Sequence, residues 1–310
     1  MKGLHKSLLM GYVLAISGGI FWAVGGSCGQ YLFENYGVSS DWLVPIRLNC
    51  SGLLLLLIGL LRKQDLFAIW HDKRDIFDLL IFGFFGSALC QFAFYSTIEY
   101  ANIALATVLA YMSPSLILVY TVLKERRAPK FYEVICVSLV LAGAYTCTTH
   151  WNIHSLAITP KALMWGVISA MTFALYTVQP LRLLTKFDLP VVIGWGMVVG
   201  GIAQDILFQP WKTSVQTDPV FFLNLFVVVV FGTVLAFFCY QFGITMVGSI
   251  TGSILSSVEP IASMIISVIF LNVTLVGLDY LGFIMILSSI PIIALGNLKK
   301  ARAAKARKTT

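Results

Sequence analysis

Two charged residues, Glu259 and Arg47, lie inside long apolar stretches of the sequence. Glu259 is about halfway along the stretch 248–271 and is followed directly by Pro260. A charge at the centre of a membrane-spanning helix costs roughly 2.5–3.5 kcal/mol, and a proline inside a helix frees a backbone carbonyl one turn earlier. We therefore expect Glu259 to bind a substrate amine or a proton beside an opened helix. The alternative is a packing role, in which the carboxyl group satisfies the kinked backbone.

Arg47 follows Pro45 closely, near one end of the apolar stretch 43–61. A long basic side chain in this position can extend to the membrane interface. It can equally line an outer vestibule and bind a carboxylate, for which the planar guanidinium group is suited. A direct pair between Arg47 and Glu259 is a third arrangement, and it depends on the depth of the two residues in the membrane.

Further polar and aromatic residues fall at middle depths of the apolar stretches. The polar residues offer hydrogen-bonding atoms, and the aromatic ones offer walls that stack on a ring or surround a cation. For each of them, packing or hydrogen bonding between helices is the alternative role. The predicted set that binds substrate or protons comprises Glu259, Arg47, Trp22, Gln91, Tyr95, Tyr111, Ser113 and Tyr176, with helix breaks at Pro114 and Pro260.

These residues require membrane-spanning helices to position them. Of the 310 residues, 58% are hydrophobic and only 11% are charged, whereas a soluble domain carries roughly 25% charged residues. Lipid must therefore cover much of the surface, and a spanning helix needs about 20 mostly apolar residues. The sequence predicts an all-α membrane protein with ten such helices, at residues 8–31, 43–61, 79–98, 103–123, 134–149, 162–184, 191–208, 221–242, 248–271 and 280–298.

Basic residues are distributed unequally between the loops of this ten-helix arrangement. Eighteen of the 21 Lys and Arg residues fall on one side, and only Lys161 and Lys212 fall on the other. Because cytoplasmic loops are enriched in Lys and Arg, we expect both termini in the cytoplasm, with the basic tail 299–310 against anionic headgroups. Since the charges flank apolar stretches, the net charge of +7 does not indicate a nucleic-acid partner.

The two halves of the sequence resemble each other. Residues 86–114 align without gaps on residues 232–260, with six of 29 positions identical, and Trp22-Ala23 aligns with Phe173-Ala174. We expect a first five-helix repeat at 1–150 and a second at 151–298. Because five is odd, the second repeat must enter the membrane from the opposite side, and such inverted repeats are typical of secondary transporters.

Several short motifs occur in an order and spacing that are more specific than any one of them. They are Ile20-Phe21-Trp22-Ala23, Arg47, Ser113-Pro114, Leu123-Lys124-Glu125 and Ser257-Val258-Glu259-Pro260. With them, residues 14–295 resemble the EamA type of the drug/metabolite transporter superfamily. The resemblance implies a ten-helix bacterial inner-membrane protein that transports amino acids, amines or carboxylates, commonly as an exporter. One departure is Leu271-Asn272-Val273, which leaves Glu125 without a counterpart in the second repeat.

We therefore expect a secondary active transporter of small metabolites that works by alternating access, with protons as a candidate coupling ion. A facilitated exchanger of sugars or nucleotide-linked metabolites is one alternative, but it would favour several basic residues within the spans. A sensor or enzyme that does not transport is another, although enzyme motifs are missing from the sequence. No cofactor or metal is expected, since the six cysteines form no CxxC pair. The expected partners are a small-molecule substrate and the lipid bilayer, and both a monomer and a homodimer fit.

Overall fold

The structure, a computed structural model, describes residues 2–151, 159–256, 258–272 and 274–306, and every regular element in these ranges is helical. The first half contains α1 (Lys2–Tyr36), α2 (Ser40–Leu61), α3 (Lys73–Ile81), the π-helix η2 (Phe82–Leu89), α4 (Cys90–Tyr100), α5 (Ile103–Ala110), α6 (Ser113–Glu125) and α7 (Phe131–Thr149). The second half contains α8 (Pro160–Val178), α9 (Leu181–Leu184), α10 (Leu189–Phe208), α11 (Pro219–Val229), the π-helix η4 (Val230–Leu235), α12 (Ala236–Val247), α13 (Ser249–Leu255), α14 (Val258–Phe270) and α15 (Gly277–Ala306). Short 3-10 turns lie at Ala68–Trp70 and Pro210–Lys212.

Seven helical segments within the described residues are long and apolar enough to cross a membrane. They are Leu8–Tyr36, Ser40–Leu61, Lys73–Tyr100, Ile103–Glu125, Pro160–Leu184, Leu189–Phe208 and Pro219–Val247. Shorter apolar helices at Phe131–Cys147, Val258–Phe270 and Gly277–Ser289 coincide with the three remaining stretches expected from the sequence. The all-helical membrane fold is therefore confirmed, while the count of ten crossings stays a prediction.

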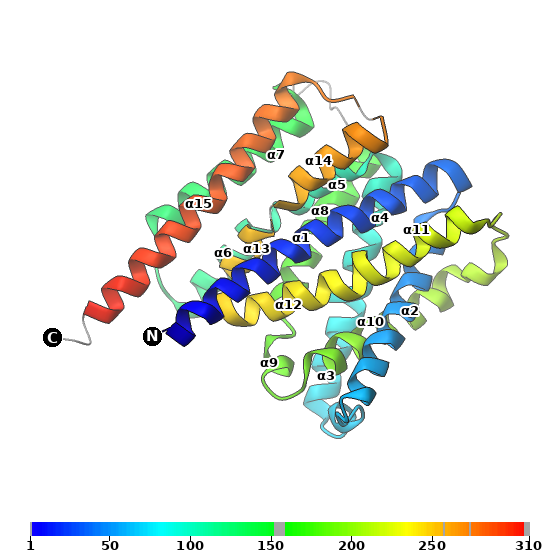
Figure 1. Ribbon diagram of the computed structural model, residues 1–310, viewed down its shortest axis with the longest axis horizontal. Helices are drawn as coiled ribbons and strands as arrows, with labels where there is room; N and C mark the ends of the chain where they lie inside the picture. Colours follow the sequence, from blue (N-terminus) through cyan, green and yellow to red (C-terminus); the bar gives the residue numbers. More distant parts are fainter. Residues whose placement is uncertain (1, 152–158, 257, 273, 307–310) are drawn as a thin grey trace.

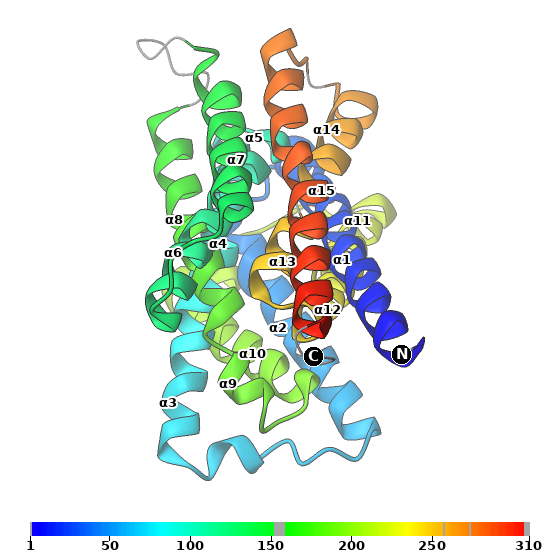
Figure 2. The same ribbon diagram turned by 90° about the vertical axis from the view of Figure 1, so that its left-hand side faces the viewer.

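The first helices of the two halves run in opposite directions. In Figures 1 and 2, α1 leads away from the end of the bundle where both termini lie, whereas α8 leads back toward that end and is followed there by α9. The most extensive packing joins α2 with α10, α7 with α15, and α1 with α12. Glycine permits the close approach of α7 and α15, because a Cβ atom on Gly143 would lie 2.6 Å from the carbonyl oxygen of Gly282.

Each half contains one apolar helix that is interrupted just before a proline. Helix α5 ends at Ala110 and α6 begins at Ser113, while α13 ends at Leu255 and α14 begins at Val258. Proline has no N–H to donate and clashes with the preceding turn of a helix, but it is tolerated in a first turn. Pro114 and Pro260 accordingly lie in the first turns of α6 and α14.

Two further features recur at positions that the alignment of the halves pairs with each other. The π-helices η2 and η4 end at the aligned residues Leu89 and Leu235. The aligned residues Tyr95 and Gln241 both donate to a carbonyl oxygen of the first helix in their own half. Tyr95 donates to Gly25 at 3.3 Å, and Gln241 donates to Tyr176 at 3.4 Å. These correspondences are consistent with a fold of two repeats.

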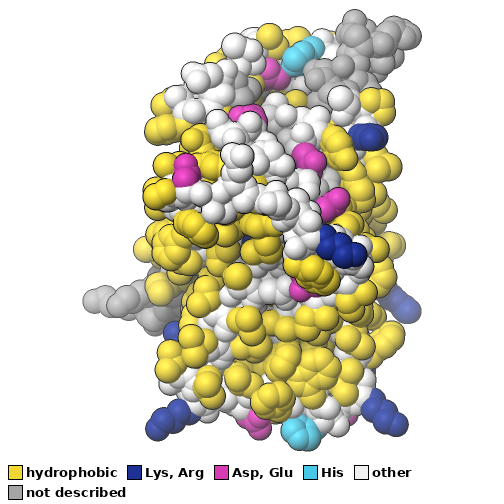
Figure 3. Space-filling model, turned by 90° about the vertical axis from the view of Figure 1, so that its right-hand side faces the viewer, with side chains coloured by type: hydrophobic (Ala, Val, Ile, Leu, Met, Phe, Trp, Pro, Cys, Tyr) yellow, Lys and Arg dark blue, Asp and Glu magenta, His cyan; other side chains and the backbone are white. Residues whose placement is uncertain are grey.

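The outer surface carries many large apolar side chains. Leu61, Phe131 and Phe270 are among the most exposed, each with more than 70% of its surface accessible, and hydrophobic side chains cover broad areas of the face shown in Figure 3. Contiguous apolar surface on this scale is unusual for soluble proteins. It fits a chain whose helices are surrounded by lipid.

Candidate functional site

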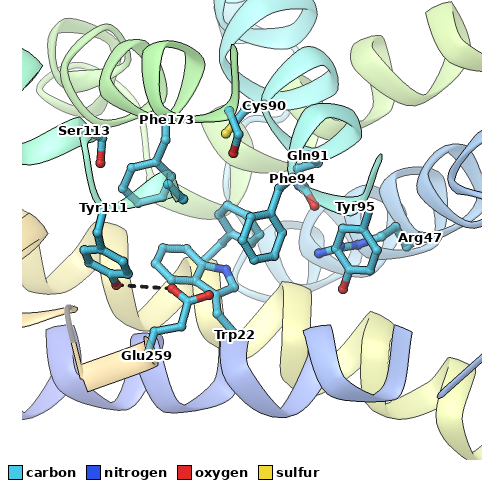
Figure 4. A pocket seen from close by; sticks show the side chains of 13 residues that line it. Trp22, Arg47, Cys90, Gln91, Phe94, Tyr95, Tyr111, Ser113, Phe173 and Glu259 are labelled. Carbon is cyan, nitrogen blue, oxygen red and sulfur yellow. Dashed lines mark hydrogen bonds between the residues drawn. The ribbon is translucent and has the colours of Figure 1, made fainter. Parts of the chain in front are cut away.

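A cavity lies at the interrupted helices, enclosed by elements from both halves of the chain. It is lined by Trp22, Arg47, Cys90, Gln91, Phe94, Tyr95, Ala110, Tyr111, Ser113, Ser169, Phe173, Phe237 and Glu259. Seven of the eight residues predicted from the sequence are thus brought together (Figure 4). The space between the lining atoms is about 510 Å³, of which only about 40 Å³ is wide enough for the centre of a water molecule. The side chains therefore leave little room inside the cavity.

The acidic end of the cavity is formed where the two helix interruptions meet. The hydroxyl group of Tyr111, which follows α5, lies 3.2 Å from Oε2 of Glu259 and also contacts the carbonyl oxygen of Ser256. Glu259 itself is in the first turn of α14 and is only 6% exposed. The interruptions therefore bring a backbone carbonyl group and a carboxyl group together at one point in the interior.

Arg47 forms the basic end of the cavity and is 2% exposed. It donates to Thr233 Oγ1 from Nε at 3.1 Å and from Nη2 at 2.8 Å, and Nη2 also lies 3.4 Å from the carbonyl oxygen of Gly232. Its guanidinium carbon is 4.1 Å from the centre of the Tyr95 ring. Nη1 has no hydrogen-bond partner among the described residues. This buried position favours the cavity over the membrane interface.

Arg47 and Glu259 are not paired with each other. No ion pair joins them in the described part of the chain, and in Figure 4 the Glu259 carboxyl group lies beside the Trp22 ring, whereas Arg47 lies beside the Tyr95 ring.

Helix α1 gives the axial distance between the two backbone segments that neighbour these groups, Ser256 beside Glu259 and Gly232 beside Arg47. A Cβ atom on Gly19 would lie 2.7 Å from the carbonyl oxygen of Ser256, whereas Gly25 packs directly against Gly232. Six residues of helix at 1.5 Å each place these two levels about 9 Å apart.

Aromatic rings form the wall between the two ends. The ring of Trp22 contacts those of Phe173 and Phe237 at centroid distances of 5.6 and 5.0 Å. Tyr176, which we expected in this wall, is fully buried behind it, 5.0 Å from Phe237 and 5.3 Å from Phe82. The cavity is therefore lined by edges and faces that suit an apolar group or a cation.

Several buried polar atoms around the cavity lack a partner within the ranges that the structure describes. They are Nε1 of Trp22, Nη1 of Arg47, both side-chain polar atoms of Gln91, and Oγ of Ser113. A buried polar atom without a hydrogen bond costs roughly 1–3 kcal/mol, so a polar ligand that supplied the missing bonds would be stabilised here. The described residues contain no group of three or more His, Cys, Asp or Glu that could hold a metal ion.

Some lining residues were not predicted from the sequence, namely Cys90, Phe94, Ala110, Ser169, Phe173 and Phe237. The repeat contained a signal for one of them, because Phe173 is the residue that aligns with Trp22. Thr233, which anchors Arg47, aligns with Ser87, but nothing in that pairing indicates a contact with an arginine.

Comparisons with known proteins agree with the resemblance seen in the motifs. The model of the EamA-like transporter family matches residues 9–149 and again residues 160–295. The uncharacterized inner membrane transporter YicL of Salmonella typhimurium is 35% identical over 285 residues, which cover 92% of this chain and 95% of that protein. A solved crystal structure of a protein with 18% identity superposes with a TM-score of 0.68, covering 94% of this chain and 97% of the other, and shows that the fold is shared.

Proposed function

Because the chain belongs to the EamA-like transporter family, we propose that it carries a small zwitterionic metabolite, such as an amino acid, across the bacterial inner membrane. The observation that supports this substrate class is the buried cavity with a guanidinium group at one end and a carboxyl group at the other. In the proposed complex, the substrate carboxylate binds the free Nη1 of Arg47. The substrate ammonium group binds Glu259.

The dimensions of the site suit a zwitterion of this size. Two hydrogen bonds of about 2.9 Å each and the ~3 Å between the ammonium and carboxylate groups of an α-amino acid, estimated from bond lengths, together span about 9 Å. This length is comparable with the axial distance along α1 between Gly19, which contacts Ser256, and Gly25, which contacts Gly232. Gln91 and Ser113, whose side-chain polar atoms lack partners among the described residues, would supply further hydrogen bonds to a ligand in the cavity.

The transport cycle we propose is alternating access by two inverted five-helix repeats, 1–150 and 151–298, with the tail 299–310 and both termini in the cytoplasm. Two similar packings of opposite orientation give inward-open and outward-open states of comparable energy. The narrow cavity corresponds to a closed state, in which Trp22, Phe173 and Phe237 must move before a substrate enters. We propose export coupled to protons, with Glu259 binding a proton and a substrate ammonium group in turn.

Binding is tested by thermal unfolding of the purified protein with amino acids, amines, carboxylic acids and sugars. A zwitterion should raise the unfolding temperature of the wild type, and both Glu259→Gln and Arg47→Gln should remove that effect. Glu125→Gln and Arg62→Gln, which change exposed charges, should leave it intact. Stabilisation by sugars or nucleotides alone would support an exchanger of those compounds instead.

Coupling is tested in liposomes with an imposed proton gradient, using the compound that stabilises the protein most. Uptake should depend on the gradient in the wild type and in Glu125→Gln but not in Glu259→Gln. Unchanged gradient-dependent uptake in Glu259→Gln would remove this carboxyl group from the coupling mechanism.

A further inference from the structure

Buried hydroxyl groups in the helices of this protein commonly donate to the carbonyl oxygen one turn earlier. Thr97 donates to Ala93 at 2.7 Å, and Thr177 donates to Phe173 at 2.9 Å. This bond is the usual way for a serine or threonine inside an apolar helix to satisfy its hydroxyl group. A buried helical hydroxyl group that does not make this bond is therefore available to another partner.

Helix α14 carries two such hydroxyl groups. Ser263 and Ser267 are both fully buried, at 0% exposure, and neither Oγ atom has a hydrogen-bond partner among the residues that the structure describes. They follow Glu259 at intervals of four residues, so the three side chains lie on one face of the helix. On the opposite face, Ile265 and Ile269 are 48% and 62% exposed and face lipid.

The line of polar groups leads out of the cavity. Helix α14 begins at the cavity and runs toward the end of the bundle that is opposite the two termini (Figures 1 and 2). Eight residues of helix between Glu259 and Ser267 cover about 12 Å. Ser267 is three residues from the end of the helix at Phe270, and the first exposed polar residue beyond that end is Asn272.

The spacing along this line fits bridging water molecules. Side chains four residues apart on one helix face are about 6 Å apart along the axis, which is close to two consecutive O–H···O hydrogen bonds of about 2.8 Å. One water molecule between each pair would give Ser263 and Ser267 the hydrogen bonds that they lack. Buried waters in proteins bind in this way to polar groups that are otherwise unsatisfied.

We propose that Glu259, Ser263 and Ser267 form a proton path from the face opposite the termini to the cavity. A proton enters the line of water and hydroxyl groups at Ser267, and each oxygen accepts one proton as it passes its own to the next. The carboxylate of Glu259 becomes a carboxylic acid. The water molecules and serine hydroxyl groups then rotate back to their original orientation, so that the path can carry the next proton. The path deepens the proposed function, because it supplies the proton that displaces the substrate ammonium group from Glu259.

The first half of the chain does not repeat this line. In the alignment of the halves, Ser113 takes the place of Glu259. In the same register beyond the aligned residues, Ile117 takes the place of Ser263 and Thr121 that of Ser267, so the line is interrupted at Ile117. Helix α6, which holds all three residues, leads from the cavity toward the end of the bundle where the termini lie. The proposed path therefore reaches one face of the membrane only, and protons arrive from the side opposite the termini.

Water access to α14 can be measured without knowing the substrate. The six native cysteines are replaced by alanine, and single cysteines are introduced as Ser263→Cys, Ser267→Cys and, as the lipid-facing control, Ile265→Cys. A membrane-impermeant thiol reagent is applied to sealed vesicles of either orientation. We expect Ser263→Cys and Ser267→Cys to react at least tenfold faster than the control, and only from the face opposite the termini. Rates equal to the control, or reaction only from the face of the termini, would overturn the path.

Proton arrival at Glu259 provides a second measurement. After a pH step on the face opposite the termini, infrared difference spectra of the protein in liposomes record the carbonyl band of the protonated carboxyl group, identified by its loss in Glu259→Gln. The double variant Ser263→Ala/Ser267→Ala should slow the appearance of this band at least tenfold with unchanged final amplitude, and Ile265→Ala should not slow it. An unchanged rate in the double variant would contradict the path, while leaving the proposed substrate site untouched. Failure of substrate to bind would in turn leave this measurement unaffected.

Discussion

Arg47 donates two hydrogen bonds to the hydroxyl oxygen of Thr233, and that hydroxyl group donates onward to the carbonyl oxygen of Val228 at 2.8 Å. Arg47 comes from α2 in the first half of the chain, whereas Thr233 belongs to η4 in the second. The contact therefore joins the two halves at the basic end of the cavity. It also fixes the guanidinium group so that Nη1 is the nitrogen left free.

Replacing Thr233 tests this contact. Thr233→Val keeps the shape of the side chain but removes the acceptor, which leaves two buried N–H groups of Arg47 without their partner. We expect a loss of roughly 1–3 kcal/mol in the free energy of unfolding, measured in detergent by chemical or thermal unfolding. Thr245→Val, at an exposed position, is the control and should change stability little. Equal effects of the two variants would show that the contact does not stabilise the fold.

The contact of Gly25 with Gly232 predicts a steric effect. A Cβ atom on Gly25 would overlap the backbone of Gly232, so Gly25→Ala should force α1 away from η4 and destabilise the protein by about 1–3 kcal/mol. Gly277 has no atom within 4 Å of the same added group, and Gly277→Ala should therefore be neutral or slightly stabilising. Unfolding temperatures of the two variants, compared with the wild type, check both expectations.

A hydrogen bond between Tyr36 and Asp218 predicts a dependence of stability on pH. The Tyr36 hydroxyl group donates to Oδ1 of Asp218 at 2.7 Å, and this bond lowers the pKa of Asp218 from its ordinary value. Because the folded-state pKa is the lower one, the bond stabilises the fold above the unfolded value of about 3.9. The stabilisation is lost as the pH falls through the folded-state pKa.

The difference in unfolding temperature between wild type and Tyr36→Phe should therefore be largest near neutral pH and shrink as the pH falls below about 4. Tyr31→Phe serves as the control, because its ring is close to Tyr36 but it is not a donor to Asp218 in the described contacts. A constant difference at every pH would mean that Asp218 does not respond to the bond.

The membrane topology predicts the location of the termini. Both ends of the chain lie at one end of the bundle in Figure 1, and the distribution of basic residues predicts that this end faces the cytoplasm. Fluorescent reporters that mature only in the cytoplasm should be active when fused to either terminus. An alkaline phosphatase inserted in the loop 213–218 should be active on the other side. Termini on different faces would rule out an even number of crossings.

The sequence alone predicted much of the fold for a simple physical reason. A lipid bilayer requires long apolar helices, so the stretches could be delimited from hydropathy, and a proline cannot continue a helix from the preceding turn. The interruptions before Pro114 and Pro260 follow from that rule. The depth of Glu259 also followed from its place within an apolar stretch, and the structure places it at the cavity.

The contacts within the site could not be predicted in the same way. Whether Arg47 extends to the membrane interface or into the interior depends on the rotation of α2 about its axis. That rotation is set by contacts with residues far away in the sequence, here Thr233 and Gly232. Tyr176 is aromatic, as the residues of the cavity wall are. The rotation of α8 about its axis, however, puts Phe173 in that wall and Tyr176 behind it. The π-helical conformation of η2 and η4 is not indicated by any residue pattern that we identified.

The π-helices have a mechanical consequence. A π turn contains more residues than an α turn of the same helix, so η2 and η4 each hold a little surplus chain beside the cavity. Converting such a turn into an α turn would rotate the residues on one side of it, about the helix axis, relative to those on the other. Gln91, Tyr95 and Phe237 all follow a π turn, so a change in either turn would alter the direction in which these lining residues point.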